Sequence, residues 1–298
     1  MAGGQGTRLY PLSTPEKPKQ FLDLAGRGRT LIQLTCDRFS ELDPEARFWV
    51  VTAADYVPLV REQLPQISEE QIIAEPVQRN TAPCIALACR KIKARFPDAA
   101  IAVTPSDAYV PDGKAFAATL AEALNFASGR RAIVTVGISP TSPHTGYGYI
   151  EKGSVVSGNI HKVLSFKEKP SGELAEKYLS AGTFLWNAGI FVWNTGTIEE
   201  ELRLHAPSLA ALMDSIEAAF GTPDEPAVLA RLFPQAEKIS IDYALLEKSD
   251  CVYTIGADWA WSDLGSFEAI EAVTGRQIPR SIKDAQAAYQ AAKLACKR

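Results

Sequence analysis

The chain has 298 residues, of which 46% are hydrophobic and 22% are charged, and its formal net charge is −4. A globular chain of this size needs neither disulfides nor a structural metal for stability. The acidic balance speaks against nucleic acid as a partner, although a local cluster of Arg and Lys still allows small anionic substrates. The five cysteines include no CxxC pair, which favours buried free thiols in a reducing compartment. No basic, apolar leader and no run of about 18 apolar residues occurs, so a cytoplasmic protein without a membrane partner is expected.

The first half of the chain alternates short apolar runs with amphipathic stretches. Strands are expected at residues 48–53, 71–76, 99–107 and 131–138, and helices at 55–64, 81–96 and 113–127. Strands that alternate with helices of this length predict an α/β protein with a doubly wound, mostly parallel, Rossmann-like mixed sheet.

The pattern changes after about residue 140. Three strand-like segments separated by turn residues (YGYIEK, HKVLSFKEKP and TFLWNAGIFVWN) precede helices at 195–205 and 207–220, and a further strand is expected at 249–257. These segments predict an α+β lobe that covers the sheet. No internal repeat or low-complexity linker appears. We therefore expect one catalytic domain over residues 1–275 and an Ala-rich helical tail over 276–298.

A glycine-rich loop, AGGQGTRLYPLS, opens the chain and is followed by PKQF. Gly3, Gly4 and Gly6 allow a tight turn that brings backbone N–H groups against an anion without Cβ clashes. Arg8 can form a bidentate contact with phosphate, and Lys19 follows a proline that can direct it back towards the loop. The loop has neither the GK[ST] ending of the ATPase P-loop nor the glycine spacing of the Rossmann dinucleotide-binding loop. From these residues alone, the segment can be interpreted either as a phosphate-binding loop or as a glycine turn followed by a surface arginine.

The loop with its PLS and PKQF segments resembles the signature of the sugar-1-phosphate nucleotidyltransferases, in particular their mannose-1-phosphate guanylyltransferase branch. The resemblance implies that the loop wraps the triphosphate of a nucleotide and that Arg8 and Lys19 stabilise its charge. The nucleotide-binding residues of the loop would be Ala2, Gly3, Gly4, Gly6 and Thr7.

Members of this family carry an apolar strand directly before the loop. Here Met1 stands at the loop, so the first strand of the sheet is expected to be missing unless another segment fills its place. Its neighbours would keep unpaired backbone groups, each costing about 1–3 kcal/mol if buried.

EPVQRNTAPCIALA (75–88) is similar to the segment that contributes to base recognition in the family. Guanine needs an acceptor for its N1–H and N2–H₂ groups and a donor for its O6. These groups would come from Glu75, Arg79, Asn80, Thr81 and the backbone. Asn80 or Thr81 is also a natural N-cap of the following helix, and the two roles are compatible.

Two acidic residues are the expected metal ligands. Asp107 ends a predicted strand, where ligand sites of α/β sheets collect. The family has a metal-binding Asp at this point, followed by His where this chain has Ala108. WAWSDLGSFEAI (259–270) resembles the closing segment of the family and makes Asp263 the second ligand. Because nucleotidyl transfer needs a divalent cation to neutralise the phosphates, Mg²⁺ is the expected cofactor.

Three more segments imply the sugar site. Residues 137–153, 163–171 and 184–194 resemble, in that order, the family segments P-T-x-P-E-T-G-Y-G-Y-I, F-x-E-K-P and W-N-x-G-I-F. The glycines would let backbone N–H groups approach the sugar hydroxyls, and Lys169 would contact the sugar phosphate. His144 stands where Glu is common and is given no catalytic role. The sugar-binding residues would be Gly146, Tyr147, Gly148, Glu168 and Asn187.

KISIDYALLEKS (238–249) resembles a segment typical of the mannose-specific guanylyl branch, where it is expected to shape the site rather than perform chemistry. The resemblance covers roughly residues 2–273. It implies that GTP and mannose 1-phosphate form GDP-mannose and pyrophosphate by metal-assisted in-line attack, with Arg8, Lys19 and Lys169 as catalytic residues. Two alternatives are open: a related transferase that uses another nucleotide or hexose 1-phosphate, and a regulatory subunit that binds GDP-mannose without making it. A homodimer is also open.

Overall fold

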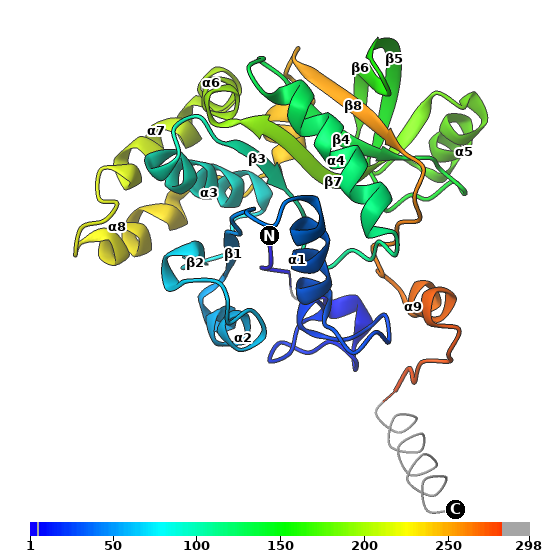
Figure 1. Ribbon diagram of the computed structural model, residues 1–298, viewed down its shortest axis with the longest axis horizontal. Coiled ribbons are helices and arrows are strands. Elements are labelled where there is room, and N and C mark those ends of the chain that lie inside the picture. Colours follow the sequence, from blue (N-terminus) through cyan, green and yellow to red (C-terminus); the bar gives the residue numbers. More distant parts are fainter. Residues whose placement is uncertain (5, 282–298) are drawn as a thin grey trace, which may run out of the picture.

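The computed structural model describes residues 1–4 and 6–281 (Figure 1). The helices are α1 (Leu31–Leu42), α2 (Val57–Gln63), α3 (Thr81–Arg95), α4 (Gly113–Ala127), α5 (Gly172–Ala181), α6 (Thr195–His205), α7 (Pro207–Glu217), α8 (Glu225–Leu232) and α9 (Phe267–Thr274). The strands are β1 (Val50–Ala53), β2 (Ile72–Glu75), β3 (Ala100–Val103), β4 (Ile133–Ile138), β5 (Tyr149–Ser157), β6 (Ile160–Lys167), β7 (Phe184–Asn194) and β8 (Val252–Ala257). The helix predicted for the end of the chain falls mainly on residues 282–298, outside the described part.

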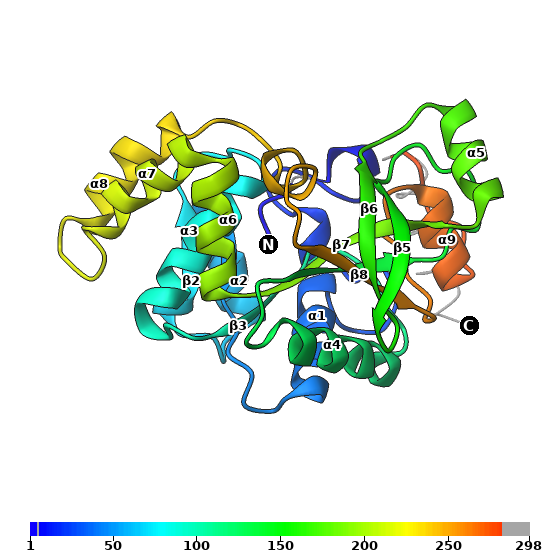
Figure 2. The same cartoon turned by 90° about the horizontal axis from the view of Figure 1, so that it is seen from above.

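Six strands form one mixed sheet in the order β3-β7-β4-β8-β6-β5, and β1 and β2 form a separate parallel pair. Strand β7 lies antiparallel between β3 and β4, whereas β8 is parallel to β4. Strands β3, β4 and β8 therefore point the same way. The predicted α/β class with a mixed sheet is confirmed, but most neighbouring strands described in this sheet are antiparallel rather than parallel as predicted. Helices α3, α6, α7 and α8 pack together at one end of the molecule, whereas α5 lies at the other (Figure 2).

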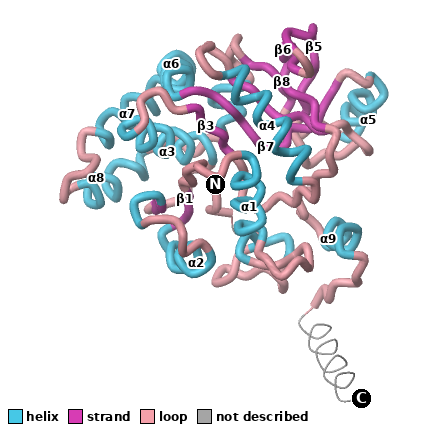
Figure 3. Tube along the Cα trace, viewed as in Figure 1, coloured by secondary structure: helices cyan, strands magenta, loops and turns pink. Residues whose placement is uncertain are grey.

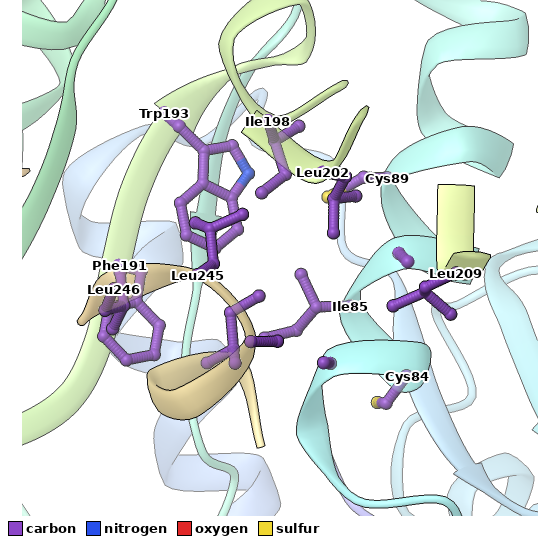
Figure 4. Close-up of a cluster of buried hydrophobic side chains, with 14 of the residues drawn as sticks. Cys84, Ile85, Cys89, Phe191, Trp193, Ile198, Leu202, Leu209, Leu245 and Leu246 are labelled. Atoms are coloured by element: carbon purple, nitrogen blue, oxygen red, sulfur yellow. The ribbon is translucent and has the colours of Figure 1, made fainter. Parts of the chain in front are cut away.

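A large apolar cluster joins α3 to the late part of the chain (Figure 4). It packs Ile85 of α3 against Trp193 of β7, Leu209 of α7 and Leu245, all of them buried. Leu245 belongs to a short π-helix, Asp242–Leu246. Because burying one such side chain contributes about 1.5–3 kcal/mol, this cluster fixes the π-helix firmly against the sheet.

Four cysteines are buried with free thiols: Cys36, Cys84, Cys89 and Cys251. Burial raises the pKa of the Cys36 thiol to about 11 and that of Cys89 to about 12, which keeps both protonated and unreactive. Cys296 lies outside the described residues. Within residues 1–4 and 6–281, no helix is both long and apolar enough to cross a membrane.

The β1–β2 pair and the six-stranded sheet are separate, and the first two residues lie between them. Among the strands of residues 1–4 and 6–281, β1 pairs only with β2, and β3 pairs only with β7. Met1 and Ala2 lie between the open edges. The Met1 ammonium donates to Thr104 O at 2.9 Å, and Ala2 N–H donates to Val51 O at 2.7 Å. From Gly6 to α1 the chain forms loops and 3₁₀ turns rather than a strand (Figure 3).

A cavity of about 950 Å³ continues this gap. Apolar side chains line it from both sides, Ile32 and Phe39 of α1 on one and Ile85 and Ile92 of α3 on the other. Strands that are buried on both faces are covered in this way. The gap between β1 and β3 is therefore lined by apolar side chains on both faces, and Met1 and Ala2 line it as well.

Candidate active site

The glycine loop is held in place by the side chain of Gln20, a residue that the sequence analysis did not single out. Its amide donates to Ala2 O at 2.8 Å and to Gly4 O at 3.0 Å, and the residue is buried. Gly6 has φ 62°, and a Cβ there would stand 2.7 Å from Lys19 Cβ. Only glycine fits this turn, because both the left-handed backbone and the space exclude a side chain. The glycine loop is thus fixed against Lys19, the residue expected to stabilise the charge of the bound triphosphate.

Lys19 joins the two acidic residues expected to bind metal. It is buried, with 5% of its surface exposed, and its ammonium donates to Asp107 Oδ2 at 3.0 Å and to the backbone oxygen of Asp263. The two acidic loops also pair with each other, since Tyr109 and Ser262 form a β-bridge. Three predicted residues from distant parts of the sequence therefore meet at one point beside the loop.

The carboxylate of Asp263 is oriented by two donors. Its Oδ1 accepts from Tyr147 O–H at 2.8 Å and from Gly265 N–H at 3.1 Å. Tyr147 was predicted to bind the sugar, and its ring stacks on His144 with centroids 3.9 Å apart. Burial, together with the charge of Asp263, raises the pKa of Tyr147 well above its usual value, so the phenol remains a donor. Arg8 is exposed and close enough to oppose this shift, which places its charge at the same end of the site.

Glu75 ends β2 and lies against the glycine loop. Only 5% of it is exposed, and a Cβ on Gly3 would stand 3.4 Å from its Oε2. Among the described residues its buried Oε1 has no hydrogen-bond partner. Burial raises the pKa of Glu75 to about 7. A buried carboxylate without donors is costly in the free chain, and a ligand that offers N–H groups would remove that cost.

The rest of the predicted base-recognition segment contacts other backbone groups. The guanidinium of Arg79 donates to Pro234 O. Asn80 caps α3 and accepts from Thr81 N–H at 2.8 Å, as the N-cap interpretation predicted. The Thr81 hydroxyl accepts from Ile241 N–H at 2.9 Å. This segment therefore connects directly to the late segment 238–249.

The predicted sugar residues lie together at the start of β5, the end of β6 and the neighbouring part of β7. A Cβ on Gly148 would stand 2.7 Å from Glu168 Oε2, and Asn187 N–H donates to Gly148 O at 2.8 Å. Lys169 pairs with Glu168 and has a φ of 44°, a left-handed conformation that is uncommon outside glycine. Gly146 donates its N–H to His144 Nδ1 at 3.1 Å. Asp242, which the sequence analysis left unassigned, accepts from Asn187 Nδ2 at 3.1 Å.

A glycine loop packed against a buried lysine that contacts two acidic loops at the end of an α/β sheet is typical of nucleotide-binding α/β proteins. Residues 1–277 match the family model described as Nucleotidyl transferase, and the chain belongs to this family.

Relatives of known name extend the match. The chain is 40% identical over 274 residues to "Mannose-1-phosphate guanylyltransferase" of Sinorhizobium fredii and 36% identical over 282 residues to the protein of that name from Escherichia coli K12. Both matches cover 91% of this chain but 53% and 58% of those proteins, so the chain spans about half the length of these relatives. The crystal structure of "mannose-1-phosphate geranyltransferase" from Thermus thermophilus has a TM-score of 0.83 at 33% identity, covering 93% of this chain and 78% of that chain. The predicted resemblance to sugar-phosphate nucleotidyltransferases is confirmed.

Proposed function

We propose that the chain makes GDP-mannose and pyrophosphate from GTP and mannose 1-phosphate, the reaction named by its curated relatives. The buried ammonium of Lys19 carries this proposal. It brings Asp107 and Asp263 together beside the glycine loop, where two polyanions would have to meet. The sugar phosphate is already an anion, so the reaction needs no covalent enzyme intermediate. The protein has to position both phosphates and offset their charge.

Asp107 and Asp263 would hold Mg²⁺ through their carboxylates. Their loops meet at the Lys19 ammonium, which contacts Asp107 Oδ2 and the backbone oxygen of Asp263. The ion would supply charge neutralisation at the phosphates. The loop N–H groups and Arg8 would bind the triphosphate of GTP. Lys19 would offset charge at the transferred phosphate. Lys169, beside Glu168, would do the same at the attacking phosphate of the sugar.

Recognition of the base is assigned to Glu75. Its buried carboxylate has acceptor capacity that the protein leaves unused, and guanine offers two adjacent donors, N1–H and N2–H₂. Adenine presents no such pair of donors on that edge. Arg79, Asn80 and Thr81 would then position the segment, since their side chains already contact the backbone.

The proposal is tested by measuring pyrophosphate release over a panel of nucleoside triphosphates and hexose 1-phosphates. Highest kcat/KM for GTP with mannose 1-phosphate is expected. Preference for dTTP or UTP with glucose 1-phosphate would identify a related transferase. Tight binding of GDP-mannose without pyrophosphate release would identify a regulatory subunit.

Substitution of Glu75 by glutamine is expected to weaken guanine binding while stabilising the free chain at alkaline pH. The pKa of Glu75 in the folded chain, about 7, lies above its ordinary value of 4.5, so the folded chain binds the proton more tightly. That stabilisation is present at low pH and is lost as the pH rises through 7. Between pH 5 and 8 the wild type should lose about 2 kcal/mol of stability that the glutamine variant retains.

Denaturant unfolding at both pH values, with the KM for GTP at pH 8, checks this prediction. The KM should rise roughly 10–100-fold in Glu75→Gln, because a hydrogen bond to a charged acceptor is lost. Glu62→Gln removes an exposed carboxylate from the end of α2 and serves as the control. Unchanged KM for GTP would remove Glu75 from base recognition, whatever the stability data show.

A further inference from the structure

The amide of Asn187 has little hydrogen-bonding capacity left for a sugar. Its Oδ1 accepts from Gly189 N–H at 3.0 Å and from the Thr135 hydroxyl at 3.1 Å. Its Nδ2 donates to Asp242 Oδ1 at 3.1 Å. An amide oxygen has two lone pairs and an amide nitrogen two hydrogens, so one N–H donor remains. Asn187 can donate to a sugar hydroxyl but cannot accept from one.

Asp242 supplies the acceptor that Asn187 lacks. It is the first residue of the π-helix, a turn type that recurs at functional sites, and the buried Leu245 and Leu246 anchor that turn in the core. Asn187 and Ser240 use part of its acceptor capacity, but a carboxylate offers about four lone-pair positions.

The charges around Asp242 also indicate hydroxyl groups as its partner. Burial, with a smaller effect of the nearby Glu168 charge, raises the pKa of Asp242 to about 6, and the Lys169 ammonium opposes the shift. Two carboxylates therefore face one ammonium, and that ammonium already pairs with Glu168. Neutral O–H donors can satisfy the second carboxylate without adding charge.

Resting on the proposed function, we propose that Asp242 is a specificity-determining residue, whose carboxylate accepts a hydrogen bond from one hydroxyl of the hexose 1-phosphate. Glu168 accepts from another hydroxyl, and the free N–H of Asn187 donates to the sugar. Two acceptors and one donor in fixed positions select the directions in which the ring hydroxyls point. A hexose with one hydroxyl inverted leaves a carboxylate unpaired, a penalty that strongly discriminates against it.

The test is Asp242→Asn, which preserves the size of the side chain and a carbonyl oxygen for Asn187. The KM for mannose 1-phosphate should rise about 10–100-fold, whereas the KM for GTP should change less than about twofold. The loss should then be measured with each monodeoxy mannose 1-phosphate. It should disappear with the one analogue that lacks the partner hydroxyl and persist with the others. Glu247→Gln, an exposed carboxylate in the same segment, should behave as wild type.

An equal loss with every deoxy analogue would show that Asp242 only positions Asn187, and would overturn the assignment. If Asp242→Asn did not fold, Asp242→Glu, which retains the charge, would replace it in the same series. Failure of the proposed function gives a different result, since the wild type would then turn over no hexose 1-phosphate with GTP. In that case the affinities of wild type and variant for GDP-mannose and for GDP test Asp242. A loss confined to GDP-mannose supports the assignment, and equal affinities reject it.

Discussion

Asp263→Asn is expected to lower the rate of pyrophosphate release from GTP and mannose 1-phosphate by about 10³-fold while the chain stays folded. The amide oxygen can still accept from Tyr147 and Gly265, and the backbone oxygen that binds Lys19 is untouched. Only the negative charge is lost. A neutral amide is a poor ligand for Mg²⁺, so charge neutralisation at the phosphates should fail while the geometry of the site is kept.

Turnover at saturating substrates and the melting temperature of the same preparation check this prediction. Asp258→Asn is the matched control, because Asp258 is an exposed residue of the same loop. Turnover near that of the wild type in Asp263→Asn would remove Asp263 from the site. A large drop in melting temperature would instead assign it a structural role.

Part of the candidate site could be predicted from the sequence, because some of its residues follow predicted strands or lie in short segments that resemble the family. Asp107 was predicted to end a strand, and it follows β3. Asp263 follows β8 after a short loop, and a β-bridge between Tyr109 and Ser262 brings the two loops together. The meeting of Lys19 with both could not be predicted, because it depends on a turn of the opening loop that Gly6 and Gln20 determine. A glutamine in a loop carries no signal of such a role.

Asp242 was not singled out from the sequence for a different reason. Its segment, 238–249, was expected from the resemblance to shape the site rather than perform chemistry. The π-helix directs the Asp242 carboxylate towards Asn187. No pattern in a single sequence predicts that orientation. Tyr147, which was predicted to bind the sugar, donates its hydroxyl to Asp263, a contact that the sequence did not indicate.

The helices with long amphipathic patterns were predicted most closely. Helix α4 has the predicted bounds, and α3 differs by one residue. Helix α1 was not predicted, although Thr30 and Gln33 form a capping box that signals its start. The sheet order was beyond prediction, because β7 enters between β3 and β4 from far along the chain and only tertiary packing decides its place.

The gap beside Met1 is lined by apolar side chains of α1 and α3. An extension of about five apolar, β-branched residues before Met1 is expected to raise the melting temperature by roughly 5–10 °C. The added residues would continue the parallel bonding that Met1 and Ala2 begin, and would pair with the open edges of β1 and β3. Their side chains would enter the cavity of about 950 Å³. The bond from Met1 to Thr104 O survives, because an amide N–H replaces the ammonium.

Two controls separate strand insertion from a general effect of the extension. A Gly-Ser extension of equal length should leave the melting temperature unchanged, since it buries no apolar surface. An extension in which every second residue is serine should give a smaller gain than the fully apolar one, because α1 and α3 cover both faces of the gap with apolar side chains. Equal melting temperatures for all three extensions would contradict the prediction. A gain found only together with association in gel filtration would assign it to contacts between chains. With strand insertion, β1 and β2 join the six-stranded sheet, and the glycine loop is then held by a continuous strand instead of by two residues and Gln20.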